Sequence, residues 1–257
     1  MKFCGNISFM FGEATSIIER YALAKNAGFK AVESAFPSGF TLEQVKQAKE
    51  NAGVEQVLIN LKADEESPVV TAIPGKENEF KTAFATTIQY AKAVNAKKVH
   101  IMAGTIEKPT ESNWVTYENN LKYAAGVLRT ENLVGLIEPI NHYSVPNYFL
   151  SDFGRAVEII KRIDSPHLRL MLDIFHLQQI QGDLSHAITK FMPYVGHVQI
   201  AQVPHRNEPN TPGEINYEYV LKHLATSGYD DWVGLEYKPL GATQDGLGWI
   251  NKFGYSL

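Results

Sequence analysis

Cysteine is almost absent from this sequence, since Cys4 is the only one in 257 residues. A single cysteine cannot form an intrachain disulfide, and nothing in the sequence points to an oxidising compartment. Apolar runs of about 18 residues, the length that a transmembrane helix requires, are also missing. The initial segment, MKFCGNISFM, is too short and too polar for a signal peptide. These features together predict a cytoplasmic protein.

An excess of positive charge is missing as well. The chain has 24 lysines and arginines against 28 aspartates and glutamates, which gives a formal net charge of −4. Binding to nucleic acid and to anionic lipid both depend on clustered positive charge. We therefore expect no nucleic-acid partner and no membrane partner, and a barrel nuclease with a basic groove is disfavoured. The expected partner is a small molecule.

Three familiar motifs do not occur. The sequence has no P-loop and no Gly-x-Ser-x-Gly nucleophile elbow. A doubly wound nucleotide-binding sheet normally carries a glycine-rich fingerprint after its first strand. The segment Cys4-Gly5-Asn6, followed by Gly12, does not match that fingerprint. A doubly wound sheet is therefore disfavoured.

Short apolar runs alternate with helical patterns along the whole chain. Several runs are nearly continuous in Val, Ile and Leu, as expected of parallel strands that are buried on both faces. The eight runs are Phe3–Phe9, Ala31–Ala35, Val54–Asn60, Lys98–Gly104, Leu133–Ile140, Leu168–His176, Val195–Ala201 and Trp232–Pro239. In a chain of this length they predict an α/β fold, one single-domain (β/α)8 TIM barrel spanning residues 1–257.

The starts and stops of several helices can be read from the sequence. Ser16-Ile17-Ile18-Glu19 and Thr41-Leu42-Glu43-Gln44 have the spacing of capping boxes, which satisfy free N–H groups in a first helical turn. Gly28 and Gly53 stand where a glycine would end a helix. Two predicted strand-to-helix segments, 61–76 and 202–216, are long and polar. Active sites of TIM barrels lie on this side of the barrel, so we expect the site there.

Each of the last four apolar runs contains one oxygen-bearing side chain near its C-terminal end. These are Glu138, Asp173, Gln199 and Glu236. A buried carboxylate must be paired, protonated or bound to a cation, and four oxygen donors from neighbouring strands suit a hard divalent ion. Taken singly, each has an ordinary explanation: a rim glutamate, a helix cap or a core amide. Their shared position makes a metal site a real alternative.

Three histidines lie near this end of the predicted barrel. His197 precedes Gln199 by two residues, so it shares a strand face but lies one layer deeper, and we interpret it as a hydrogen-bonded core histidine. His176 follows Asp173 by three residues and is a candidate metal ligand or substrate contact. His100 could face the floor of the pocket or be structural.

Arg206 stands in the long loop after the seventh run. Its planar guanidinium suits a carboxylate or phosphate, although a solvated loop arginine is the simpler interpretation without the metal pattern. Cys4 has no adjacent base that would activate it, so we expect a small buried residue.

Six segments, most of them at the ends of predicted strands, together form a combination that is specific for one protein family. Each segment alone would be weak evidence. They are Ile137-Glu138-Pro139-Ile140-Asn141, Leu172-Asp173-Ile174-Phe175-His176, residues 196–204, Arg206-Asn207-Glu208-Pro209, Gly213-Glu214-Ile215-Asn216-Tyr217 and Glu236-Tyr237-Lys238-Pro239. Through them the chain resembles the hydroxypyruvate isomerase family, within the xylose isomerase-like TIM barrel superfamily. The resemblance covers essentially the whole chain.

This resemblance implies that Glu138, Asp173, Gln199 and Glu236 bind a divalent metal ion. Mg²⁺ or Mn²⁺ is expected because the ligand set lacks thiolates. The resemblance also implies that Glu138 and Glu236 move the proton as hydroxypyruvate and tartronate semialdehyde (2-hydroxy-3-oxopropanoate) interconvert through an enediolate. We expect the carboxylate of such a 2-oxo acid to contact Arg206, with His176 beside it.

Neighbouring functions stay open. Ketose 3-epimerases usually carry a histidine where this chain has Gln199, which favours the hydroxypyruvate branch. A 2-oxo-tetronate isomerase or a sugar epimerase is the nearest alternative; outside the class, a non-catalytic sugar-acid binding protein would lack a working acid–base pair. His205 stands where many members carry glycine, and the loop at Pro212 is longer, which leaves substrate size open. Homo-oligomerisation is open too.

Overall fold

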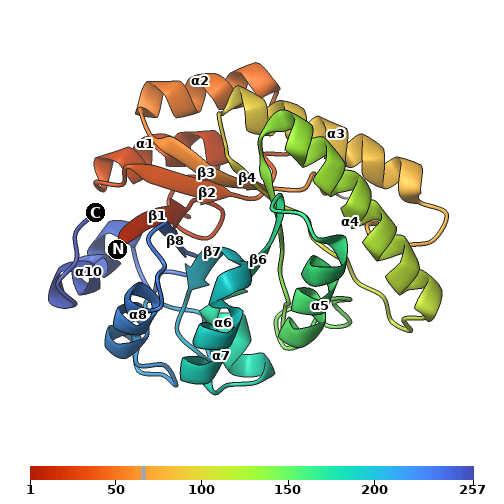
Figure 1. Cartoon of the computed structure of the whole chain (residues 1–257). Helices are drawn as coiled ribbons and strands as arrows, with labels where there is room; N and C mark the ends of the chain where they lie inside the picture. Colours follow the sequence, from red (N-terminus) through yellow and green to blue (C-terminus); the bar gives the residue numbers. More distant parts are fainter. Residues whose placement is uncertain (65–67) are drawn as a thin grey trace.

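The chain folds into a closed barrel, and the computed structural model describes its residues 1–64 and 68–257 (Figure 1). Eight strands pair in parallel in chain order, and the last strand pairs with the first. The strands are β1 (Lys2–Asn6), β2 (Ala31–Ser34), β3 (Glu55–Asn60), β4 (Lys98–His100), β5 (Val134–Ile137), β6 (Leu168–Asp173), β7 (Val195–Ile200) and β8 (Trp232–Leu235). The predicted (β/α)8 barrel is confirmed.

Helices surround the strands (Figure 1). They are α1 (Ile17–Asn26), α2 (Leu42–Ala52), α3 (Glu77–Ala93), α4 (Glu111–Glu131), α5 (Phe153–Ile163), α6 (Ile174–Ile180), α7 (Leu184–Phe191), η1 (Met192–Tyr194), α8 (Tyr217–Thr226), α9 (Thr243–Gly246) and α10 (Gly248–Lys252). α5 illustrates how they pack: Phe153, Ala156, Val157 and Ile160 are buried on one face, as their helical spacing predicts.

One of the two predicted capping boxes is present. The backbone N–H of Gln44 donates to Thr41 Oγ1 at 3.3 Å, and Gln44 Oε1 accepts from the backbone of Thr41 at 2.8 Å. The other box is wrong, because Ser16 begins α1 without a side-chain cap bond. Arg20 holds this start of the helix instead, through hydrogen bonds from its guanidinium to the carbonyls of Ala14 and Ile7.

Several strands are shorter than the apolar runs that predicted them. β5 and β8 both end before their runs do, although Glu138 and Pro139 after β5 and Tyr237 after β8 are still buried. A hydrophobic pattern reports burial and not strand pairing, so it continues past the last paired residue. Glu138 and Glu236 therefore each lie one residue beyond a strand.

The interior of the barrel is divided into an apolar and a polar part. The apolar cluster consists of Cys4, Ala31, Val57, Leu58, Leu136 and Met171, so Cys4 is buried as predicted. Further buried side chains are polar: Asn6, Glu33, Lys98, His100, Asp173, His197 and Gln199. Buried polar groups need partners, and the contacts among these residues define the site.

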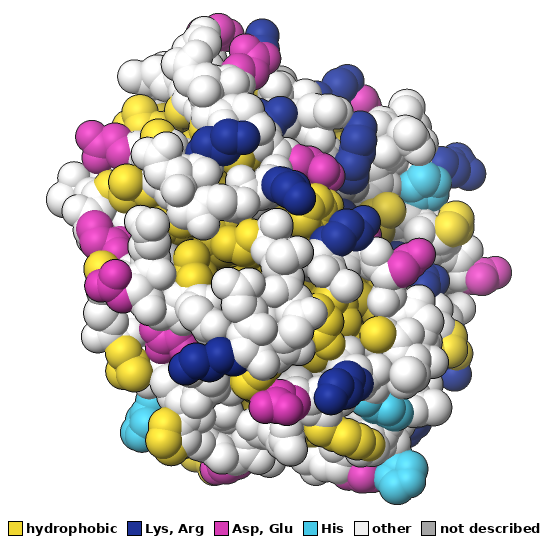
Figure 2. Space-filling model, turned by 90° about the vertical axis from the view of Figure 1, so that its left-hand side faces the viewer, with side chains coloured by type: hydrophobic (Ala, Val, Ile, Leu, Met, Phe, Trp, Pro, Cys, Tyr) yellow, Lys and Arg dark blue, Asp and Glu magenta, His cyan; other side chains and the backbone are white. Residues whose placement is uncertain are grey.

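The outer surface carries charges of both signs. On the face shown in Figure 2, lysines and arginines are interspersed with aspartates and glutamates. Within the described ranges, no helix combines the length and the hydrophobicity needed to span a membrane.

Candidate active site

Three carboxylates and one amide lie at the C-terminal ends of β5 to β8. Asp173 ends β6, Gln199 lies in β7, and Glu138 and Glu236 directly follow β5 and β8. Only 0% of Asp173, 1% of Gln199 and 4% of Glu138 is exposed, and 12% of the Glu236 side chain. The predicted set thus occupies one end of the barrel.

Direct contacts and shared partners join these residues. Oxygens of Glu138 and Asp173 and a nitrogen of His176 all lie within 4.8 Å of one another. Asp173 is the pairing neighbour of Gln199 between β6 and β7. Asp173 also caps α6, because its Oδ1 accepts from the backbone N–H of Phe175 at 2.8 Å. Its second oxygen stays available to the cluster, so the cap and the site are compatible.

Arg206 is not a solvated loop residue, since only 14% of its side chain is exposed. The guanidinium lies between the rings of Phe9 and Phe175, at 4.7 Å from each centroid. Its Nη2 donates to Asp173 Oδ2 at 3.2 Å and to Glu236 Oε2. Arg206 therefore enters the cluster itself, which its sequence position did not reveal.

The cluster holds more negative charge than its neighbours neutralise. Burial raises the pKa of Glu138 well above its usual range, and Glu236 and Asp173 add to this. Burial raises the pKa of Glu236 to about 8, against the opposing effect of Arg206. Burial raises the pKa of Asp173 too, also against Arg206. Three buried acids beside one arginine are short of positive charge.

Two buried oxygens in the cluster have no hydrogen-bond partner among the described residues: Glu138 Oε1 and Gln199 Oε1. Unpartnered buried oxygens are costly unless something electropositive faces them. Oxygen donors of this kind suit a hard divalent cation. The residues present therefore fit a divalent metal ion.

The hydrogen bonds of His176 determine which of its nitrogens carries the proton. The backbone N–H of Asn141 points at His176 Nδ1 at 3.3 Å, and the side-chain amide of Asn141 lies 2.6 Å from the same nitrogen. A backbone N–H can only donate, so Nδ1 accepts and Nε2 bears the proton. Burial lowers the pKa of His176 well below its usual range. Its neutral Nε2–H lies 3.5 Å from Asp173 Oδ2 and 3.8 Å from Glu138 Oε1, which suits a donor better than a metal ligand.

His100 and His197 have different surroundings. His100 Nε2 lies 3.5 Å from Glu138 Oε2, and burial lowers the pKa of His100 to about 3. His197 is a hydrogen-bonded core histidine as predicted, because its Nε2 lies 2.6 Å from Glu33 Oε2. Burial alone would raise the pKa of Glu33, but His197 and the hydrogen bonds to Glu33 lower it overall.

Sequence reasoning missed Glu33 and Asn6. Glu33 stands near the end of the second apolar run and Asn6 ends β1, so both fit the pattern that was applied only to the last four runs. Asn6 Nδ2 donates to Glu33 Oε1 and to Glu236 Oε1, at 3.0 Å each. The site therefore extends to the first two strands.

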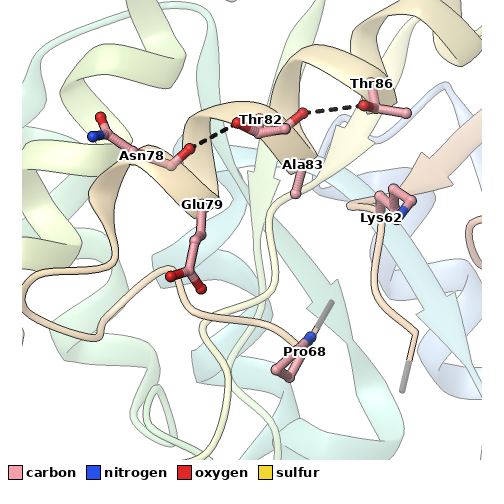
Figure 3. Close-up of a pocket in the computed structure, with 7 residues that line it drawn as sticks. All are labelled: Lys62, Pro68, Asn78, Glu79, Thr82, Ala83 and Thr86. Carbon is pink, nitrogen blue, oxygen red and sulfur yellow. Dashed lines mark hydrogen bonds between the residues drawn. The ribbon is translucent and has the colours of Figure 1, made fainter. Parts of the chain in front are cut away.

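A surface pocket of about 410 Å³ has a lining that includes no residue of this cluster (Figure 3). It is lined by Lys62, Pro68, Asn78, Glu79, Thr82, Ala83 and Thr86. The hydroxyls of Thr82 and Thr86 donate to backbone carbonyls of their own helix, α3 (Figure 3). Lys62 and Glu79 are ion-paired with other residues. Because its polar groups serve local structure, we do not place the chemistry here.

Known proteins are similar to this chain in both sequence and fold. A family profile described as Xylose isomerase-like TIM barrel matches residues 21–253. A Drosophila melanogaster protein provisionally named hydroxypyruvate isomerase is 42% identical, covering 100% of this chain and 99% of the relative. The hydroxypyruvate isomerase of Escherichia coli (strain K12) is 36% identical over 98% of this chain and 99% of its own. The 2-oxo-tetronate isomerase of Cupriavidus necator is 33% identical over 98% of both chains.

Solved structures agree on the barrel. A Brucella melitensis protein described as an AP endonuclease of family 2 has a TM-score of 0.93 at 36% identity, over 98% of both chains. A D-psicose 3-epimerase from Clostridium cellulolyticum H10 has a TM-score of 0.80 over 100% of both chains, and at 16% identity it shares the fold alone. The chain belongs to the xylose isomerase-like TIM barrel family and, within it, to the hydroxypyruvate isomerase family. It is accordingly an isomerase.

Proposed function

We propose that this isomerase interconverts hydroxypyruvate and tartronate semialdehyde and that it requires Mg²⁺ or Mn²⁺. The observation that carries the proposal is the cluster of Glu138, Asp173 and Glu236, which is buried and short of positive charge. Glu138 and the adjacent Gln199 each have a buried oxygen without a hydrogen-bond partner among the described residues. The names of relatives at 42% and 36% identity support the choice of substrate.

Glu138, Asp173, Gln199 and Glu236 are the proposed ligands of the cation. Their donors are all oxygens, which favours Mg²⁺ or Mn²⁺ over a structural zinc ion. When bound, the cation would polarise the carbonyl and hydroxyl oxygens of the substrate and stabilise the negative charge that develops as a proton leaves. The unpartnered oxygens of Glu138 and Gln199 support this set.

Glu138 and Glu236 are the proposed acid–base groups. The reaction moves a carbonyl to the neighbouring carbon, so one carbon loses a proton and the other gains one. A carboxylate is an effective base when its pKa lies near the working pH. Burial raises the pKa of Glu236 to about 8 in the metal-free protein, and a bound cation would lower it from there. One glutamate removes the proton, and the same or the other glutamate returns it.

Arg206 and His176 are the proposed contacts of the substrate carboxylate. Burial opposes the charge of Arg206, but Glu236 and Asp173 raise its pKa, so it remains a cation. The rings of Phe9 and Phe175 fix the plane of its guanidinium. The Nε2–H of His176 adds a second donor beside the same carboxylates.

Product formation with and without metal tests the proposal. Chelator-treated protein is incubated with hydroxypyruvate, and the aldehyde product is trapped and measured before and after addition of Mg²⁺ or Mn²⁺. We expect turnover only with the metal. Undiminished turnover in protein that metal analysis shows to be metal-free would contradict the metal requirement.

A 2-oxo-tetronate isomerase is the second candidate, favoured by the 33% identity to the Cupriavidus necator enzyme. Measuring kcat/KM for hydroxypyruvate, 2-oxo-tetronate and ketoses under the same conditions separates the alternatives. We expect the highest value for hydroxypyruvate. A higher value for the four-carbon acid or for a ketose would reassign the substrate, and binding without turnover of any would indicate a sugar-acid binding protein.

A further inference from the structure

Glu33 lies at the centre of a chain of hydrogen bonds that crosses the interior of the barrel below the cluster. No part of Glu33 is exposed. Its carboxylate is contacted from two other strands: by Cys4 and Asn6 in β1, where Cys4 Sγ lies 3.5 Å from Oε2, and by His197 and Gln199 in β7. Gly234 of β8 leaves room for it. The mechanism proposed above uses none of these contacts of Glu33.

The direction of each hydrogen bond below Glu33 is determined by chemistry. Lys98 has only donors, and its Nζ lies 2.7 Å from Asp231 Oδ2 and 3.3 Å from His197 Nδ1. His197 Nδ1 must therefore accept, which leaves the proton on Nε2. That proton points at Glu33 Oε2, 2.6 Å away. Lys98 and His197 thus hold the Glu33 carboxylate as an acceptor.

The same carboxylate determines which end of the Gln199 amide faces the cluster. Gln199 Nε2 donates to Glu33 Oε1 at 2.6 Å. The reverse orientation would set two acceptor oxygens against each other, so the amide nitrogen must face Glu33. Gln199 Oε1 is consequently turned away from Glu33, and it is one of the buried oxygens without a hydrogen-bond partner among the described residues. Without Glu33, nothing in this contact would distinguish the two orientations of the amide.

Asn6 transmits the same constraint to Glu236. Its Nδ2 donates to both Glu33 Oε1 and Glu236 Oε1, at 3.0 Å each. Its Oδ1 accepts from the backbone N–H of Ser8 at 3.1 Å, so the amide cannot be reversed without losing that bond. Glu33 therefore fixes, directly or through Asn6, two of the four proposed ligands.

The glycine at position 234 supports a requirement for the carboxylate at this place. A Cβ on Gly234 would lie 2.4 Å from Glu33 Oε1 and 2.5 Å from Oε2. Any larger residue at 234 would displace the carboxylate. Cys4, Glu33 and His197 also have ligand atoms within 4.8 Å of one another. The Lys98 ammonium beside His197 disfavours a cation there, so we interpret these contacts as a brace and not as a second metal site.

We infer that Glu33 is a positioning residue, which aims the carbonyl oxygen of Gln199 at the catalytic cation and holds Glu236 through Asn6. The inference rests on the proposed function. Residues that orient metal ligands through hydrogen bonds typically affect metal affinity by about 10- to 100-fold when they are replaced. Glu33→Gln should lower the affinity for Mn²⁺ by this factor, because an amide can no longer accept from His197, Gln199 and Asn6 together.

A titration of chelator-treated protein with Mn²⁺ tests the positioning role of Glu33 without any turnover. The EPR signal of free Mn²⁺ measures how much of the ion is bound. A double-mutant cycle with Glu33→Gln and Gln199→Ala separates positioning from the loss of a nearby charge. If Glu33 acts largely through Gln199, Glu33→Gln costs much less affinity in the Gln199→Ala background than alone. Equal losses in both backgrounds would overturn the inference, since a charge effect adds independently.

Two further variants complete the test. Cys4→Ser is the matched control: it changes a contact of Glu33 Oε2 but none of the bonds to Gln199 or Asn6, and it should keep the wild-type Mn²⁺ affinity. Gly234→Ala displaces the Glu33 carboxylate while keeping its charge. It replaces Glu33→Gln in the binding measurement if Glu33→Gln does not fold. Gly234→Ala should weaken Mn²⁺ binding by a similar factor. Unchanged binding would overturn the inference. Failure of the wild type to bind Mn²⁺ would instead contradict the proposed function.

Discussion

Replacing Glu236 by glutamine should stabilise the metal-free protein while it abolishes most of the activity. Glutamine keeps the shape of the side chain and one oxygen, which can accept from either Asn6 or Arg206, but it carries no charge and cannot accept a proton. In the metal-free protein the pKa of Glu236 is raised from 4.5 to about 8 by burial. The folded state therefore binds its proton more tightly than the unfolded state does.

The sign and size of the effect follow from proton linkage. Between pH 4.5 and 8 the unfolded state binds fewer protons at this position than the folded state, so the free energy of unfolding falls as the pH rises. At about 1.4 kcal/mol per pKa unit, this costs the metal-free wild type about 3 kcal/mol at pH 7. Glu236→Gln removes that cost. For a domain of this size, about 3 kcal/mol corresponds to a Tm higher by roughly 6–12 °C.

Urea unfolding of chelator-treated wild type and Glu236→Gln at pH 5, 6, 7 and 8 measures this difference. The variant should be more stable, and its advantage should grow with pH up to about 8. Glu55→Gln, at an exposed position at the start of β3, is the matched control and should show no such trend. With metal present, the variant should lose roughly 10²- to 10⁴-fold in kcat. A variant less stable than the wild type at pH 7, or an advantage that does not change with pH, would refute the reasoning.

Three further outcomes are expected. Glu138→Gln should also lose roughly 10²- to 10⁴-fold in kcat while circular dichroism shows a folded protein; near wild-type kcat would remove Glu138 from the proton transfer. Arg206→Ala should raise KM for hydroxypyruvate by about 10- to 100-fold, and Arg206→Lys should recover only part; an equal penalty with uncharged dihydroxyacetone would show that Arg206 does not bind the carboxylate. Thr41→Ala removes the capping box of α2 and should lower the free energy of unfolding by about 1 kcal/mol without changing kcat, whereas a change in kcat would contradict a purely structural role.

The fold and one side of the candidate site could be predicted because strand ends are visible in the sequence. A buried carboxylate at the end of an apolar run stands out, and this rule selected Glu138, Asp173 and Glu236. Glu33 and Asn6 lie near the C-terminal ends of the short strands β2 and β1, where a single polar residue looks like the edge of a strand.

The burial of Arg206 could not be predicted, because it depends on the path of a loop. The residue adopts a left-handed backbone conformation, with φ at 61°, and its guanidinium lies beside Asp173 and Glu236. The rings that enclose it, Phe9 and Phe175, come from two distant segments. The donor role of His176 likewise depends on Asn141, 35 positions away. Such contacts between distant segments leave no periodic pattern in a sequence.

Exchange of substrate protons with solvent tests the central claim most directly. In D₂O, with Mg²⁺ as the only added divalent metal ion, the proton NMR signal of the hydroxymethyl group of hydroxypyruvate should decay in the presence of wild-type protein. It should persist with chelator. Loss of the signal at the wild-type rate in the chelated, metal-free protein would contradict a metal-dependent proton transfer by this cluster.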